Sequence, residues 1–147
     1  MGIEPNFSQA DFNSDLERRI AAIKAAIINR LKRLGEMCLI ECRTNHKYVD
    51  RTGNLTASMG YVIVDHGNII HTAGFGGSGK EGPAEGRNLA NSLSGQFRDG
   101  YALIVVAGMN YAIYVEAKGF NVLTTSELLA ERQLPIMIEQ LKRNIGA

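Results

Sequence analysis

Apolar residues recur at steps of three and four along the first third of the chain, which is the spacing of one face of an α-helix. The positions are Leu16, Ile20, Ile23, Ile27, Leu31 and Leu34. Ser14 and Glu17 have the spacing of a capping box, so we expect the helix to begin at Ser14 and to end at about Thr44. Residues 1–13 show no helical period and contain Pro5, and we expect a flexible arm there.

Runs of β-branched and aromatic residues predict three strands. Residues 59–65 and 69–72 flank the turn sequence Asp65-His66-Gly67-Asn68, which predicts an antiparallel hairpin. Residues 101–107 are apolar throughout, as expected of a central strand that is covered on both faces. Residues 111–117 fit a short helix about as well as a strand, and we prefer the helix.

A glycine-rich segment and a closing helix complete the pattern. Residues 74–100 contain one candidate short helix, around 84–97, which would place Leu89, Leu93 and Phe97 on one side. Because glycine loses much backbone freedom on folding and local packing looks sparse, we expect a mobile excursion that becomes ordered against a neighbour. Thr124 and Glu127 form a further capping box, which predicts a helix to about Asn144.

The composition is that of one ordinary globular domain, with 147 residues, 45% of them hydrophobic and 21% charged. We therefore expect a single α+β domain over residues 14–147, in which a small, mainly antiparallel sheet packs against the long first helix and the closing helix. The formal net charge of +1 is too small for binding of nucleic acid or a membrane surface through overall charge. The longest strongly apolar stretch, 102–109, is far shorter than the roughly 20 residues that span a bilayer, so no membrane partner is expected.

Three patterns could carry chemistry, and each is incomplete. Residues 74–80 fit the start of a phosphate-binding loop, but Glu81 stands where a hydroxyl should hold magnesium. Cys38, Cys42 and His46 recur every four residues, yet closed zinc sites rarely take three ligands from one helix, and we favour two buried thiols and a solvated histidine. No nucleophile motif is present in the sequence. We expect no enzymatic activity, no cofactor and no metal.

The clearest electrostatic feature is a run of six basic residues without one acid. They are Arg18, Arg19, Lys24, Arg30, Lys32 and Arg33. With the apolar stripe turned inward, we expect these side chains on the outer faces of the helix, where they would meet DNA phosphates or an acidic protein, or remain solvated.

Two short motifs follow the long helix. The first, Thr52-Gly53-Asn54-Leu55-Thr56-Ala57-Ser58-Met59, has the pattern Thr-Gly-x-Leu-x-x-Ser-hydrophobic, and the second, Tyr111-Ala112-Ile113-Tyr114-Val115-Glu116, the pattern Tyr-Ala-x-Tyr-Val-Glu. Together with the order of predicted elements, they make residues 15–145 resemble the tail-completion or neck proteins of long-tailed bacteriophages. Within the first motif, we expect Thr52 to cap the turn, Gly53 to relax the backbone and Leu55 to plug the sheet.

The resemblance implies a structural virion protein that forms a homo-oligomeric ring in the neck and joins the DNA-filled capsid to the tail. Its partners would be connector or portal-side proteins and tail proteins, and it would lie in the host cytoplasm during assembly. The alternative is a nucleic-acid-binding module that uses the basic helix, and weak contact with the DNA backbone is left open. The interface candidates are Arg30, Lys32, Arg33, Leu89, Leu93, Phe97, Tyr111, Tyr114 and Glu116, beside the motif residues Thr52, Gly53, Leu55 and Ser58.

Overall fold

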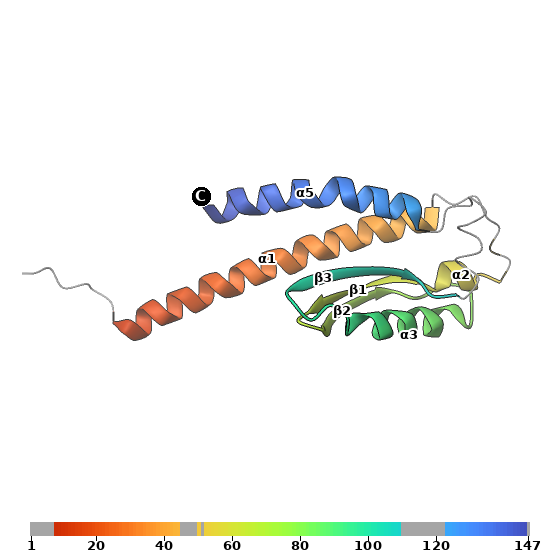
Figure 1. Ribbon diagram of the computed structural model, residues 1–147, viewed down its shortest axis with the longest axis horizontal. Helices are drawn as coiled ribbons and strands as arrows, with labels where there is room; N and C mark the ends of the chain where they lie inside the picture. Colours follow the sequence, from red (N-terminus) through yellow and green to blue (C-terminus); the bar gives the residue numbers. More distant parts are fainter. Residues whose placement is uncertain (1–7, 45–49, 51, 110–122, 147) are drawn as a thin grey trace, which may run out of the picture.

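The computed structural model describes residues 8–44, 50, 52–109 and 123–146. The elements are α1 (Gln9–Thr44), α2 (Asn54–Ala57), β1 (Met59–Asp65), β2 (Asn68–Gly74), α3 (Gly82–Ser94), β3 (Tyr101–Ala107) and α5 (Thr124–Gly146) (Figure 1). The predicted α+β class is confirmed, with a long N-terminal helix, a C-terminal helix and a three-stranded antiparallel sheet.

The sheet has the order β2-β1-β3, with β1 in the centre. The predicted hairpin is confirmed: Asp65 pairs with Asn68, and His66 and Gly67 between them have the positive φ values of a two-residue hairpin turn. Among the described residues the central strand is β1, and not residues 101–107 as expected, since β3 pairs there with β1 alone. Apolar content therefore reports burial of the two faces and not the number of strand neighbours.

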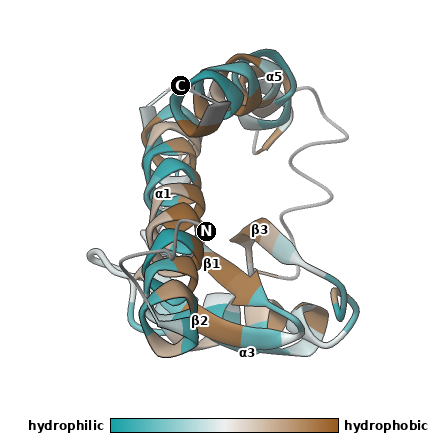
Figure 2. Ribbon diagram, turned by 90° about the vertical axis from the view of Figure 1, so that its left-hand side faces the viewer, coloured by the Kyte–Doolittle hydropathy of each residue, from teal (hydrophilic) through white to brown (hydrophobic). Residues whose placement is uncertain are grey.

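The sheet is covered on both faces by helices, as Figures 1 and 2 show from two directions. Tyr61 and Ile63 of β1 pack with Leu39 of α1 on one face. On the other face, the intervening residues Val62 and Val64 share a cluster with Phe75 and with Ala90 of α3. Successive side chains of a strand point to opposite faces, so a strand covered on both faces is apolar at nearly every position.

The closing helix α5 runs antiparallel to α1 and packs along it (Figure 1). Met137 is buried against Leu34 and Cys38, in a cluster to which Leu103 and Val105 of β3 also contribute. The N-terminal part of α1 extends past the C-terminal end of α5 (Figure 1), and Arg19 is the first α1 residue that lines a hollow between the two helices. This extension leaves the start of the apolar stripe at the surface.

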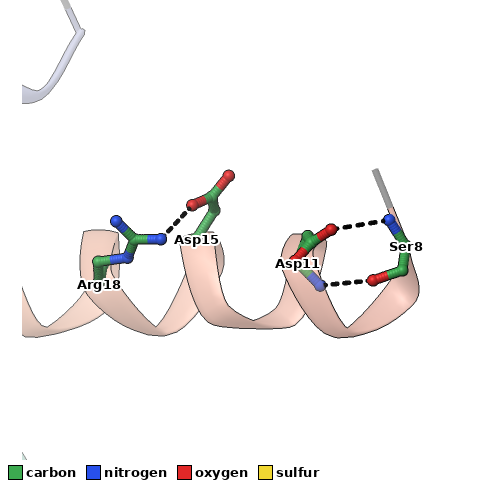
Figure 3. A network of polar contacts seen from close by, with 4 residues as sticks. All are labelled: Ser8, Asp11, Asp15 and Arg18. Atoms are coloured by element: carbon green, nitrogen blue, oxygen red, sulfur yellow. Dashed lines mark hydrogen bonds and ion pairs between the residues drawn. The ribbon is translucent and has the colours of Figure 1, made fainter. Parts of the chain in front are cut away.

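The start of α1 differs from the prediction, because the helix begins at Gln9 and Ser14 lies inside it. The capping box is formed by Ser8 and Asp11 instead (Figure 3). The Asp11 backbone N–H donates to Ser8 Oγ at 3.2 Å, and the Ser8 N–H donates to Asp11 Oδ2 at 3.1 Å. Both serines have an acid three residues later, and no Gly or Pro lies between them to stop the helix, so the earlier cap sets its start.

The glycine-rich segment contains α3, which is packed against the sheet. Phe75 and Ala90 are buried, and Gly86 lies so close to the Ser58 carbonyl oxygen that a Cβ atom there would stand 2.2 Å from it. The expectation of sparse packing over 74–100 is therefore wrong, because some of its glycines allow close approach of the backbone. Its mobility in solution stays a prediction.

Candidate interaction surfaces

The Thr-Gly-x-Leu-x-x-Ser motif forms the junction between the helices and the sheet. Thr52 Oγ1 accepts from the Asn54 N–H at 3.3 Å, Gly53 has a φ of +74°, and Leu55 is buried. Ser58 is also buried, and its Oγ donates to the Leu55 carbonyl at 2.7 Å and accepts from the Gly108 N–H at 3.0 Å. The expected roles of the first three residues agree with these contacts, and Ser58 adds a link to the end of β3.

Asn54, at a variable position of the motif, caps α3 from a distance along the chain. Its Oδ1 accepts from the backbone N–H groups of Glu81 at 3.0 Å and Gly82 at 3.1 Å. Those groups lie at the helix N-terminus, where a phosphate-binding loop would use them to hold an anion. No local pattern of the sequence indicates this contact, because 27 residues separate Asn54 from Glu81.

Arg43 joins the end of α1 to the loop after β2. Its guanidinium donates to the carbonyl oxygens of Met59 at 3.2 Å and Gly76 at 3.0 Å. Charged donors make stronger hydrogen bonds than neutral ones, so this side chain fixes the helix end against the sheet. The sequence offered no signal for it, since Arg43 stands next to the apolar stripe as any solvated base would.

Tyr61 joins α1 to the sheet through a polar group at its tip. The ring is buried against Gly35, and the hydroxyl donates to Glu36 Oε1 at 2.8 Å and lies 3.4 Å from His71 Nε2. Burial and the Glu36 carboxylate raise the pKa of Tyr61 far above its usual range. The hydroxyl therefore keeps its proton and acts as a structural hydrogen-bond donor.

The two thiols are buried and free, as the sequence predicts. Ser126 Oγ of α5 donates to the Cys38 carbonyl at 2.7 Å, which ties the start of α5 to α1. Burial raises the pKa of both thiols, and that of Cys42 reaches about 11. Among residues 8–44, 50, 52–109 and 123–146, no group of three or more His, Cys, Asp or Glu side chains could hold a metal, and His46 lies outside these ranges.

The basic residues of α1 do not share one outer face. Arg33 is exposed and Lys32 is half-buried, whereas Arg30 points toward α5 and donates to the Ala26 carbonyl at 3.3 Å. The expectation that all of these side chains face outward is wrong for Arg30, because one helical turn distributes them around the axis while α5 covers part of it.

The interface candidates on and after α3 also differ in their exposure. Leu93 packs against the cluster under the sheet, whereas Leu89 and Phe97 are 37% and 43% exposed, so the three do not form one exposed patch. Helical spacing does not reveal which side of α3 meets the sheet. Tyr111, Tyr114 and Glu116, and the choice between helix and strand over 111–117, lie outside the described residues.

Two adjoining hollows follow the seam between α1 and α5 and share Arg30 and Leu141. We call them the α1/α5 groove. The larger, of about 330 Å³, is lined by Arg19, Ala22, Ile23, Ala26, Arg30, Leu141, Asn144 and Ile145. The smaller, of about 60 Å³, is lined by Ile27, Arg30, Leu31, Leu134, Met137, Ile138 and Leu141.

Large aliphatic side chains are exposed on both helices, within this groove on α5 and near its start on α1. On α1, Leu16 is 47% and Ile20 45% exposed, and on α5, Leu134 is 41% and Ile138 43% exposed. Several large apolar side chains gathered along two neighbouring helices are typical of a surface that another protein covers.

Comparison of the chain with protein-family models, with curated proteins and with solved structures finds no match. Within the part of the chain that the structure describes, no helix is long and apolar enough to cross a membrane.

Proposed function

We propose that the protein is a structural virion protein of a phage neck, one copy in a ring that joins the DNA-filled capsid to the tail. The observation that carries the proposal is the exposed aliphatic surface along α1 and α5, which includes Leu16, Ile20, Leu134 and Ile138. A subunit that works by assembly needs such surfaces, because burying them against a neighbour supplies the free energy of association.

The polar clusters of the molecule support the same role. Asn54, Ser58 and Tyr61 each connect two elements, and their polar atoms are occupied by backbone groups or by a neighbouring side chain. Arg43 also connects two segments, the end of α1 and the loop after β2, through one terminal nitrogen of its guanidinium. This use of polar groups makes a stiff frame that holds the outer faces of α1 and α5 in position. The motif that carries the resemblance to neck proteins lies at the centre of this frame.

Four exposed cations favour the alternative, a nucleic-acid-binding module. They are Arg18, Arg19, Lys24 and Arg33 on α1. In a neck ring, the same residues would lie near DNA that passes from capsid to tail, so weak contact with phosphates is compatible with both functions. Strength and sequence selectivity of DNA binding distinguish them.

The test is a nonsense mutation in the gene of the phage or prophage that encodes this chain. Electron microscopy of the lysate should show filled capsids and finished tails that are separate, because the joining subunit is missing. Supplying the wild-type protein from a plasmid should restore joined, infectious particles. Normal infectious particles that lack the protein would refute the proposal.

A further inference from the structure

The N-terminal part of α1, which extends past α5, is exposed and acidic, whereas the part of α1 that lies beside α5 is basic. The part of the helix that extends past α5, residues 8–18, carries Asp15 and Glu17 on the two flanks of the exposed Leu16. Asp15 pairs with Arg18 at 2.9 Å, but both side chains are mostly exposed, and such a pair exchanges partners at little cost. We call residues 8–18 the overhang.

The α1/α5 groove has the opposite charge and a similar length. Arg19 and Arg30 line it, and the aliphatic side chains Ile23, Ile27 and Ile138 stand between and beside them. From Arg19 to Leu31 the groove follows about 18 Å of helix, and the overhang is about 15 Å long. An acidic apolar helix end and a basic apolar groove of matching length therefore occur on the same chain.

We propose that the overhang of one copy docks in the α1/α5 groove of a second copy, with Leu16 against the aliphatic lining and Asp15 and Glu17 beside Arg19 and Arg30. The inference rests on the proposed assembly role and names the surfaces that carry it. Charge complementarity points to a second copy of this chain as the occupant, because the chain itself supplies both halves of the match.

The contact is head-to-tail. Each copy donates one overhang and receives one at a different place, so copies add in a series that closes into a ring if the rotation between neighbours allows it. The apolar stripe of α1 continues into the overhang through Ile20 and Leu16, which leaves exposed apolar side chains for the next subunit to cover.

Charge reversal on the purified full-length protein tests the contact. We expect Asp15→Lys with Glu17→Lys, and separately Arg19→Glu with Arg30→Glu, to weaken self-association by at least about tenfold, since each sets like charges against each other. Mixing the two variants should restore association, and so should combining all four changes in one chain. Sedimentation equilibrium at several salt concentrations measures the oligomers.

Lys80→Glu with Arg98→Glu is the matched control. It changes the charge by the same amount as the groove variant, at two exposed positions before and after α3 that do not line the groove. It should leave self-association unchanged. The circular dichroism spectrum and thermal midpoint of every variant show whether it folds, and recovery in the mixture shows that a loss of association comes from charge and not from misfolding.

Two outcomes would overturn the contact. One is a wild-type protein that stays monomeric up to about 1 mM, the weak end of specific association. The other is self-association that is unchanged when the four charges are reversed. Its failure is distinct from that of the neck role. If charge reversal leaves self-association unchanged while the phage with the nonsense mutation still gives separate capsids and tails, the neck role stands and the contact is wrong. If association follows the charges while infectious particles form without the protein, the contact stands and the neck role is wrong.

Discussion

Single polar side chains hold together parts of this chain that are far apart in sequence. Ser58 reaches Gly108 across 50 residues, and Ser126 reaches Cys38 across 88. Ser58 gives the Gly108 N–H, which lies just beyond β3, a hydrogen-bond partner inside the protein. Ser126 adds a side-chain hydrogen bond to a carbonyl inside α1. Replacement of either serine by alanine would remove a hydrogen bond that joins two distant segments.

We expect the Cys42 thiol to make the free energy of unfolding depend on pH in the alkaline range. Burial raises its pKa from the ordinary 9.0 to about 11. Between these values the unfolded chain has lost the proton and the folded chain has kept it. The free energy of unfolding should therefore be unaffected by this thiol below about pH 9 and fall as pH rises toward 11, by at most about 1.4 kcal/mol per pH unit. Urea unfolding at a series of pH values measures the slope.

The variant Cys42→Ala isolates this thiol from other alkaline groups. It should lower stability below about pH 9 because the core packs less well around alanine, and show a shallower decline above that pH. If Cys42→Ala and wild type decline in parallel, the thiol titrates normally in the folded protein and its burial has no electrostatic consequence.

Helix α3 shows how glycine can serve packing. A Cβ atom at Gly86 would stand 2.2 Å from the Ser58 carbonyl oxygen and 2.6 Å from the Phe75 ring. We expect Gly86→Ala to lower the free energy of unfolding by about 1–3 kcal/mol, although alanine favours a helix by about 1 kcal/mol over glycine. Urea or thermal unfolding checks the decrease.

Gly95, at the end of the same helix, is the matched control. A Cβ atom there would meet nothing within 4 Å, and its φ of −66° suits any residue. Gly95→Ala should be neutral or stabilise by about 0.4–1 kcal/mol. A Gly86→Ala variant as stable as Gly95→Ala would show that α3 lies further from the sheet than this close approach requires.

At the scale of helices and strands, hydrophobic periodicity predicts the type of an element better than its boundaries. The stripe from Leu16 to Leu34 predicts α1, and the turn residues His66 and Gly67 predict the hairpin. The start of α1 escapes prediction because two serines offer the same capping spacing. The position of β3 at one side of β1 could not be predicted, because strand order depends on pairings between distant segments and a local sequence pattern carries no information on them.

For the whole molecule, the near-neutral charge limits binding to nucleic acid. We expect a DNA mobility shift only at low salt, with a dissociation constant weaker than about 1 µM at physiological salt. Lys32→Glu with Arg33→Glu should reduce the salt dependence, by about one unit of slope for each phosphate that the variant no longer neutralises.

A shift that survives physiological salt and prefers one sequence would contradict this expectation and favour the nucleic-acid-binding module.

The sequence by itself determined the elements and their class, because helical and strand periods, turn residues and the motif around Gly53 are local properties of the chain. Only the tertiary structure decided which of several neighbouring side chains are covered and which remain exposed. Arg30 points to α5 while Arg33 faces solvent, and Leu93 packs under the sheet while Leu89 and Phe97 remain exposed. The reason is physical: which side of a helix is covered depends on an element that lies far away in sequence, and only packing brings the two together.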